Sequence, residues 1–219
     1  MASDPHYRLL TAEEFLQIDF GADMKAELDN GVIRMMAGGT RDHSRVQVNL
    51  TTFVRSALRG SGCTPYGSDM AVRTQDRSVR YPDLTIDCGA PGDRPDDLTL
   101  SDPRVIIEVL SPSTRHFDLT VKRDEYRAIG SVDTLAFVDV DAEALSVHQR
   151  IEGGWIETLF STSVLDLAGL GHSLARPYDP SHRDLRSRLN PLLAAAASSA
   201  AIWSSARHTT GAMWLKPKL

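Results

Sequence analysis

Two carboxylates stand at unusual places in short, strand-like stretches of this chain. Asp83 follows Pro82 at the start of the run 83–88, and Glu108 lies inside the run 105–110. Alternate residues of a strand face opposite sides, and both sides of 105–110 are apolar, so Glu108 is expected in a poorly solvated place. A buried, unpaired carboxylate is costly. Glu108 must therefore be protonated, paired with a cation or bound to a metal.

Asp83 is expected to meet Glu108 if their two strands are adjacent. Asp83, Thr85 and Asp87 share one face of their strand, and Pro82 lacks a backbone donor, which suits a strand end or edge. Two converging carboxylates repel each other unless a cation lies between them. Oxygen ligands favour Mg²⁺ or Mn²⁺, so the pattern indicates a divalent metal site.

Lys122 is the one lysine in the middle of a chain that has only four. It shares one face of the predicted helix 119–129 with Leu119, Tyr126 and Ile129, so it is expected to face the sheet. A lysine there requires a carboxylate or a phosphate partner. Because this helix follows the Glu108 strand directly, it can fold back over that strand.

Each of these three residues has a simpler explanation when it is taken alone. Asp83 fits an ordinary turn residue, and Glu108 fits an edge strand whose side chain faces solvent. Lys122 fits a side chain that extends its ammonium group to water. The functional interpretation is favoured because the three occur together in the order strand, strand, helix.

The composition restricts the class of protein. With 219 residues, 42% hydrophobic and 24% charged, the chain suits one globular domain of ordinary size, with or without an appendage. Its net charge of −5 argues against a protein that coats nucleic acid, so such a partner would need a local basic patch. Cys63 and Cys88 provide neither a disulfide framework nor a zinc cluster, which predicts a reduced, cytoplasmic setting. No signal peptide or membrane span is predicted.

Caps, turns and periodicity predict the elements that position these residues. Thr11 and Glu14 form a capping box for a short helix, and Asp29-Asn30-Gly31 predicts a hairpin turn. An apolar stripe predicts a long helix over 41–59, ended by Gly60. The helix over 119–129 has Asp118 as its expected N-cap and Gly130 as its expected stop. Strands are predicted at 68–74, 83–88, 104–110, 134–141, 144–151 and 154–160.

The predicted fold is mixed α/β, with a domain boundary near residue 178. Residues 1–178 contain all of the predicted elements above. Residues 179–219 are polar and then rich in Ala and Ser, which predicts an appendage that is partly disordered or helical.

At these residues the chain resembles a known family. The stretches "YPDLTID", "VIIEVLSPST", "FDLTVKRDEY" and "TLAFVDVD" are similar to the Uma2 family of the restriction-endonuclease-like, PD-(D/E)xK superfamily. The resemblance covers about residues 8–175. It implies an αβββαβ core, here with an N-terminal helix and hairpin and additional C-terminal strands.

The resemblance also implies a metal site and a reaction. Asp83 and Glu108 would bind one or two Mg²⁺ ions, with Mn²⁺ as a substitute, and the backbone carbonyl of Val109 is a further candidate ligand. Leu110 stands where the superfamily usually has its lysine, two residues after the Glu. In the Uma2 pattern the lysine has moved to the next helix, as Lys122, where it would assist a water that attacks a phosphodiester.

Two N-terminal positions match the same family pattern. Glu27 in "AELDNGVI" is a candidate third acidic ligand through water, and the alternative is an ordinary hairpin residue. His43 in "DHSRVQVNL" is a candidate to orient the site or contact a phosphate, and the alternative is a polar first-turn residue.

These features lead to three functional hypotheses. The first is a Mg²⁺-dependent DNA endonuclease, and the second is a non-catalytic nucleic-acid- or protein-binding module that retains the fold. The third is a metal-dependent hydrolase of another phosphoester. Arg41, Arg45, Arg115 and Arg123 are candidates for contacts with a nucleic-acid backbone. Exposed edge strands after residue 134 suggest a homodimer.

Overall fold

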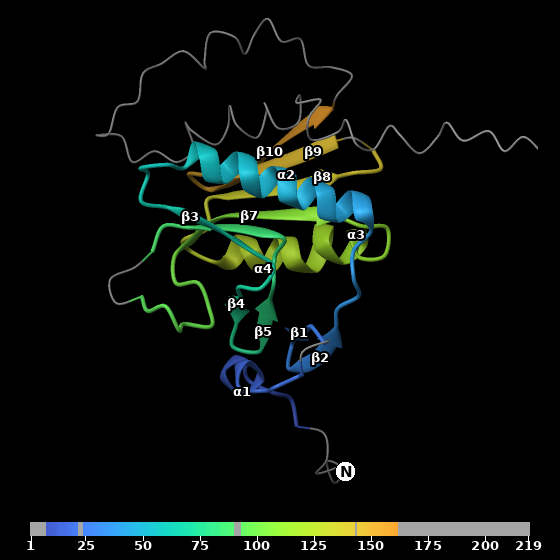
Figure 1. Ribbon diagram of the computed structural model, residues 1–219, viewed down its shortest axis with the longest axis vertical. Helices are drawn as coiled ribbons and strands as arrows, with labels where there is room; N and C mark the ends of the chain where they lie inside the picture. The colour runs from blue at the N-terminus through green and yellow to red at the C-terminus, as the bar shows by residue number, and fades with distance from the viewer. Residues whose placement is uncertain (1–7, 22–23, 90–92, 143, 162–219) are drawn as a thin grey trace, which may run out of the picture.

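The computed structural model describes residues 8–21, 24–89, 93–142 and 144–161. They form two sheets, with a smaller sheet and a short helix at one end of the molecule and a larger sheet at the other (Figure 1). The larger sheet has the strand order β10-β9-β8-β7-β6-β3. Its strands are β3 (Thr64–Gly67), β6 (Leu84–Asp87), β7 (Pro103–Leu110), β8 (Thr134–Asp139), β9 (Ala144–Ile151) and β10 (Gly154–Ser161).

The smaller sheet has the order β2-β1-β5-β4 and contains the predicted hairpin. Its strands are β1 (Ala26–Asp29), β2 (Val32–Met35), β4 (Val72–Gln75) and β5 (Ser78–Arg80). Asn30 and Gly31 have φ angles of 49° and 86°, so the predicted turn is confirmed as one with two left-handed residues. Thr11 and Glu14 form the predicted capping box at the start of α1 (Ala12–Leu16).

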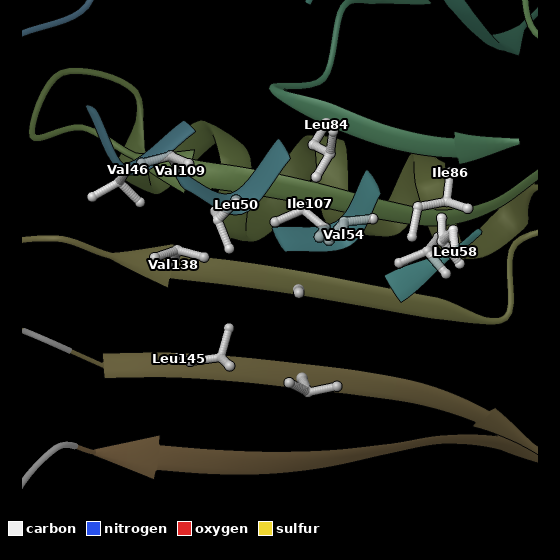
Figure 2. Close-up of a cluster of buried hydrophobic side chains, with 13 residues drawn as sticks. Val46, Leu50, Val54, Leu58, Leu84, Ile86, Ile107, Val109, Val138 and Leu145 are labelled. Atoms are coloured by element: carbon white, nitrogen blue, oxygen red, sulfur yellow. The ribbon is translucent and has the colours of Figure 1, made fainter. Parts of the chain in front are cut away.

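The predicted long helix is confirmed as α2 (Arg41–Ala57), which packs on one face of the larger sheet. Thr40 is its N-cap and accepts a hydrogen bond from the amide of His43. Its buried stripe meets the inward side chains of four strands, as Figure 2 shows for most of them. This cluster comprises Val46, Leu50, Val54, Leu58, Leu84, Ile86, Val105, Ile107, Val109, Ala136, Val138, Leu145 and Val147.

Shortening Leu50 is expected to destabilise the protein strongly. The Leu50 side chain is 2% exposed at the centre of this cluster, so Leu50→Ala removes packing and leaves a cavity. We expect a loss of about 2–5 kcal/mol in the free energy of unfolding, measured by chemical denaturation. Val48 lies on the same helix with 60% exposure, so Val48→Ala is the control and should change the stability by less than about 0.5 kcal/mol. Similar losses in both variants would contradict the assigned core.

Strand β7 is central and buried on both faces, as its composition predicts. Val105, Ile107 and Val109 join the cluster under α2, whereas Ile106 and Leu110 belong to a second cluster on the opposite face. β7 pairs antiparallel with β6 and parallel with β8, and β6 pairs antiparallel with β3. In chain order, α2, β3, β6, β7, the following helix and β8 give the expected αβββαβ core.

The helix after β7 differs from its prediction at its start. It consists of α3 (Arg115–Phe117), a π-helical turn η1 (Asp118–Lys122) and α4 (Arg123–Ala128), which follow each other directly. The prediction that Asp118 is the N-cap is wrong: the preceding cap position is Thr114, and Asp118 is 3% exposed inside the helix. The wider π turn belongs to the segment that carries Lys122, and such turns frequently occur at functional sites.

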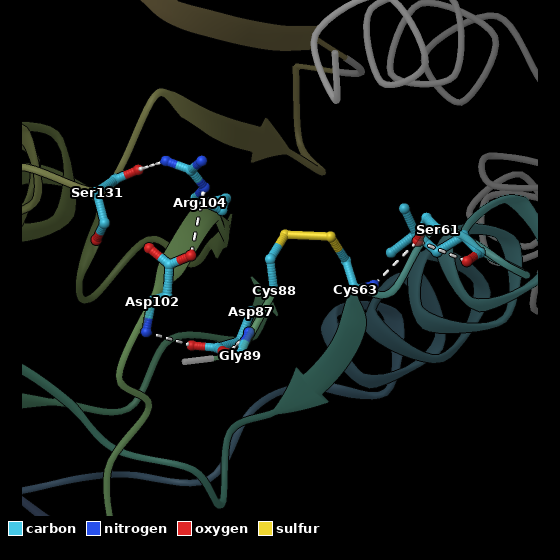
Figure 3. The surroundings of a disulfide bond; sticks show 9 residues. Ser61, Cys63, Asp87, Cys88, Gly89, Asp102, Arg104 and Ser131 are labelled. Atoms are coloured by element: carbon cyan, nitrogen blue, oxygen red, sulfur yellow. Dashed lines mark hydrogen bonds and ion pairs between the residues drawn. A yellow bond between two sulfur atoms is a disulfide. The ribbon is translucent and has the colours of Figure 1, made fainter. Parts of the chain in front are cut away.

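The structure also corrects the expectation for the two cysteines. Cys63 and Cys88 form a disulfide that joins the start of β3 to the end of β6 (Figure 3). Thr64 lies opposite Asp87 in the antiparallel β3–β6 pair. Cys63 precedes Thr64 and Cys88 follows Asp87, so the two cysteines are the next pair along the register and their sulfur atoms meet. The cysteine count predicted that both thiols are reduced, and this prediction is wrong for Cys63 and Cys88. The cytoplasmic setting stays a prediction.

Three further expectations concern the ends and surroundings of the chain. Within the described ranges, no helix is both long enough and apolar enough to cross a membrane. The C-terminal extension 179–219 lies outside the described residues, as does the boundary near residue 178. Homodimer formation stays a prediction.

Candidate metal centre

Asp83 and Glu108 lie side by side, as expected for adjacent strands. Leu84 pairs with Ile107, and Asp83, which directly precedes β6, lies next to Glu108 of β7. The Asp83 amide is 3.4 Å from Glu108 Oε2, and the Val109 amide donates to Asp83 Oδ2 at 2.8 Å. The fold therefore brings both carboxylates together at one end of the β6–β7 pair.

His43 joins this pair from the first turn of α2. Its Nε2 lies 3.2 Å from Asp83 Oδ2, and the hydrogen bond to Asp83 and the charge of that carboxylate outweigh burial and raise the pKa of the imidazole above its ordinary value. The ring fits closely against Gly39, because a Cβ there would lie 2.9 Å from His43 Nδ1. Gln47 of the same helix donates to the Asp83 carbonyl at 2.9 Å. Thus α2 holds both the side chain and the backbone of Asp83.

Lys122 contacts Glu108 from the face of the larger sheet that lies opposite α2. Its Nζ lies 3.3 Å from Glu108 Oε1, 3.0 Å from Glu27 Oε1 and 3.4 Å from Asp118 Oδ1. Burial lowers the pKa of the ammonium group, but these carboxylates outweigh the burial and raise it above its ordinary value. Lys122 is therefore a 7% exposed ammonium group paired with carboxylates, rather than a lysine that extends to solvent.

Glu27 enters the site from β1 of the smaller sheet. Its Oε1 faces Lys122 and accepts from the Tyr81 amide at 3.3 Å, and its Oε2 lies 3.5 Å from Arg80 Nη1. Arg80 is fully buried and also makes a two-point hydrogen bond to Glu125, at 2.7 and 2.8 Å. Its third partner is Asp29, at 2.9 Å.

Four buried residues of this network were absent from the predicted site: Arg80, Tyr126, Asp118 and Glu125. Tyr126 is fully buried, and its hydroxyl donates to Glu108 Oε1 at 2.6 Å. A signal existed for Tyr126 because it shares the helical stripe of Lys122, and for Asp118 because it precedes Lys122 by four residues. No sequence signal indicates Arg80, since its partners come from β1 and α4 through tertiary contacts alone.

Glu108 is electrostatically the most perturbed acid at the site. Burial raises the pKa of its carboxyl group to about 8, an effect that Asp83 and Asp118 reinforce and that Lys122 opposes. The pKa of the Tyr126 hydroxyl is also raised well above its ordinary value by burial and by Glu108. The raised pKa of Glu108 favours its protonated form in the metal-free site, and a bound cation would displace that proton.

The stability of the metal-free protein is expected to fall as the pH rises. A carboxyl group whose pKa is about 8 in the folded state and 4.5 ordinarily stabilises the fold fully below its ordinary pKa. That contribution is lost as the pH rises through about 8. The raised pKa of His43 acts in the same direction. Thermal denaturation in EDTA should therefore show a Tm that decreases between about pH 5 and pH 8.

Glu108→Gln is the matched control for this pH dependence. The amide retains the shape of the side chain but does not titrate, so the decrease should become shallower, with the part due to His43 remaining. Saturating Mn²⁺ should reverse the trend, because ligands bind metal in their deprotonated form. An equally steep decrease in the variant would show that Glu108 is not the titrating group.

The donor groups fit a hard divalent cation. Over the described ranges, no three His, Cys, Asp or Glu side chains form a ready-made metal site. The candidate donors are instead the Asp83 and Glu108 carboxylates and the Val109 carbonyl. Mg²⁺ typically takes one or two carboxylates from a protein and completes its shell with water and substrate phosphate, so this small oxygen set suits it.

The predicted basic patch is largely paired within the protein. Arg45 lies 3.6 Å from Asp42, Arg115 forms an ion pair with Asp139, and Arg123 lies 3.0 Å from Asp124. These arginines remain partly exposed, with side-chain exposures of 44%, 47% and 31%. They are available to a polyanion only in competition with their own carboxylates.

Comparison with known proteins connects this geometry to a family. The Uma2 family model, described as "Putative restriction endonuclease", matches residues 12–176, which include every residue of the site. Two proteins of Synechocystis sp. are similar over most of their length. The uncharacterized protein slr1290 is 30% identical over 169 residues, 76% of this chain and 88% of its own. The uncharacterized protein sll1609 is 27% identical over 154 residues, 69% and 87% of the two chains.

A solved structure shares the fold. A crystal structure of a protein from Anabaena variabilis, described as a "putative nuclease belonging to DUF820", matches with a TM-score of 0.57. The match covers 85% of this chain and 99% of the Anabaena chain, with 15% identical residues. A similarity at so low an identity concerns the fold alone, and it supports the restriction-endonuclease-like fold that the resemblance implied.

Proposed function

The chain belongs to the Uma2 family, and from this premise we propose that it is a Mg²⁺-dependent endonuclease that hydrolyses phosphodiester bonds of DNA. A nuclease-like function is supported by the family description and by the fold. The observation that supports the proposal is the position of Asp83 next to Glu108, with Lys122 Nζ 3.3 Å from the Glu108 carboxylate. Two carboxylates that can hold a divalent ion, with a cation beside them, can promote phosphodiester hydrolysis.

The charge balance supports a divalent ion in particular. Among the described residues, the buried network has four carboxylates, Glu27, Glu108, Asp118 and Glu125, and two cations, Arg80 and Lys122. With every group ionised, two negative charges remain in surroundings that penalise charge. The partly exposed pair Asp83–His43 adds no net charge when the imidazole is protonated. One Mg²⁺ would neutralise the excess.

In the proposed mechanism, Asp83, Glu108 and the Val109 carbonyl would hold the ion. The chemistry that Mg²⁺ would supply there is neutralisation of charge on the scissile phosphate and a lower pKa of the attacking water. Lys122 adds a fixed positive charge beside Glu108, where it stabilises charge that develops on the phosphate oxygens. His43 keeps Asp83 oriented, and with 17% side-chain exposure its ring lies where a phosphate group can approach.

A second candidate function is a binding module that retains the fold without catalysis. One observation favours it: the charge of Lys122 is already balanced by Glu27, Glu108 and Asp118. An ammonium group held in this way could serve stability alone. The two functions differ in whether metal binding leads to cleavage.

Cleavage of supercoiled plasmid by the full chain, with Mg²⁺, Mn²⁺ or EDTA, tests the proposal. We expect nicked and then linear DNA with either metal and intact plasmid in EDTA. A single-stranded RNA of mixed sequence, assayed in parallel, tests the choice of DNA. Mn²⁺ binding without cleavage of either nucleic acid would favour the binding module, and cleavage in EDTA would contradict the metal-dependent mechanism.

A further inference from the structure

We propose that the ammonium group of Lys122 takes the place of a second metal ion, so that the site binds one divalent cation per chain. This inference rests on the proposed function and specifies how many ions it uses. It also assigns Glu27 and Asp118 to the lysine rather than to the metal.

The surroundings of Lys122 Nζ resemble those of a bound cation. The three nearest carboxylate oxygens, at 3.0–3.4 Å, come from β1, β7 and the π turn, which are three separate parts of the chain. Asp118 Oδ1 is buried and makes no hydrogen bond to another described residue, so its ion pair with Lys122 is what compensates its charge. Carboxylates that converge from separate elements on one buried positive charge are the arrangement expected around a metal ion. Here the charge is carried by a side chain.

Both carboxylate oxygens of Glu27 already have partners within the protein. Oε1 contacts Lys122 Nζ and the Tyr81 amide, and Oε2 faces Arg80. With a side-chain exposure of 4%, it has no free face toward solvent. To bind a metal, Glu27 would have to release a buried ammonium or guanidinium group, which is unfavourable.

Glu108 divides its two oxygens between the two cations. Oε1 accepts from Tyr126 at 2.6 Å and from Lys122 at 3.3 Å, whereas Oε2 faces the Asp83 amide at 3.4 Å. Oε2 is therefore the oxygen that remains for the ion on the Asp83 side. With every group ionised, the buried network has an excess of two negative charges, which one divalent ion balances. A second ion would leave two uncompensated positive charges.

Counting bound Mn²⁺ tests the inference without reference to cleavage. The full chain is titrated with Mn²⁺ while the electron paramagnetic resonance signal of the free ion reports how many ions are bound. We expect one ion for the wild type and two for Lys122→Ala, because that change vacates a space lined by three carboxylates. Lys25 lies on the surface beside Asp69, so Lys25→Ala is the matched control and should still bind one ion.

Glu27→Gln provides a second arm if Lys122→Ala does not fold. It should still bind one Mn²⁺, within about threefold of the wild-type affinity, whereas perturbing a metal ligand or its support typically costs about 10- to 100-fold. Two ions on the wild type, one ion on a folded Lys122→Ala, or a large loss of affinity in Glu27→Gln would overturn the inference and leave the proposed nuclease function standing. No ion on the wild type would overturn both the inference and the metal dependence of the proposed function.

Discussion

Asp83→Asn and Glu108→Gln are each expected to lower metal-dependent DNA cleavage by about 10³-fold or more. Each amide has the shape of the acid it replaces but lacks the negative charge that holds a divalent cation. In the proposed site both carboxylates bind the same ion, so neither can replace the other. The measurement is the rate of conversion of supercoiled plasmid to nicked and linear forms under saturating Mg²⁺.

Asp87→Asn is the matched control for these two variants. Asp87 is a buried acid at the other end of β6, where it accepts hydrogen bonds from the amides of Gly89 and Asp102. Its replacement can affect stability but should leave the cleavage rate per folded molecule unchanged. Full activity in Asp83→Asn or Glu108→Gln would show that the cleaving site lies elsewhere. A comparable loss in Asp87→Asn would show that the effect is structural.

Arg80→Met is expected to produce the largest loss of stability among single substitutions near the site. Arg80 is fully buried and is the cation shared by Glu27, Asp29 and Glu125. Methionine fills similar space but leaves these carboxylates without their guanidinium. Removing one partner of a buried ion pair typically costs about 3–5 kcal/mol, because the other partner stays buried and uncompensated. Urea denaturation of the metal-free protein measures this loss.

Two comparisons separate charge from packing at Arg80. Arg73 lies on the adjacent strand β4 and pairs with Glu13 and Asp76 at the surface, so Arg73→Met should cost less than about 1 kcal/mol. In the Arg80→Met background, Glu125→Met removes one of the unpaired carboxylates and should recover part of the lost stability. A double variant that is less stable than Arg80→Met would contradict this explanation and indicate a packing defect instead.

The Arg80 network shows how the smaller sheet contributes to the candidate site. Glu27 and Arg80 belong to β1 and β5, which lie outside the αβββαβ core, whereas Glu108 and Lys122 belong to that core. The contacts of Lys122 with Glu27 and of Arg80 with Glu125 connect the two parts through buried charges. We therefore expect the smaller sheet to be needed to position Lys122.

The sequence alone predicted the elements whose signals are local. The capping box of α1, the Asn30-Gly31 turn and the apolar stripe of α2 depend on residues only a few positions apart, and each is confirmed. The two-faced apolar pattern of 105–110 also identified β7 as a central strand. Strands β3 and β5, which are short and lack clear alternation, were not predicted.

The candidate site was predictable where one strand or one helical face carries the information. Asp83 and Glu108 were singled out because a carboxylate in an apolar strand requires a partner, and Lys122 because it lies on an inward-facing helical stripe. The structure places these three together. The role of Asp118 was mistaken because a polar residue before a helical stripe has the same pattern as an N-cap, and the helix in fact begins at Arg115.

What only the tertiary structure decided is which buried charges meet. The strand register brings Cys63 to Cys88 and Asp83 to Glu108, but no local pattern specifies a register between strands that are distant in the sequence. Arg80 reaches Glu125 across 45 positions of the chain. The type of a buried charged residue indicates which kind of partner it requires. The identity of that partner depends on long-range packing, which brings the two groups within a few ångströms and excludes water from between them.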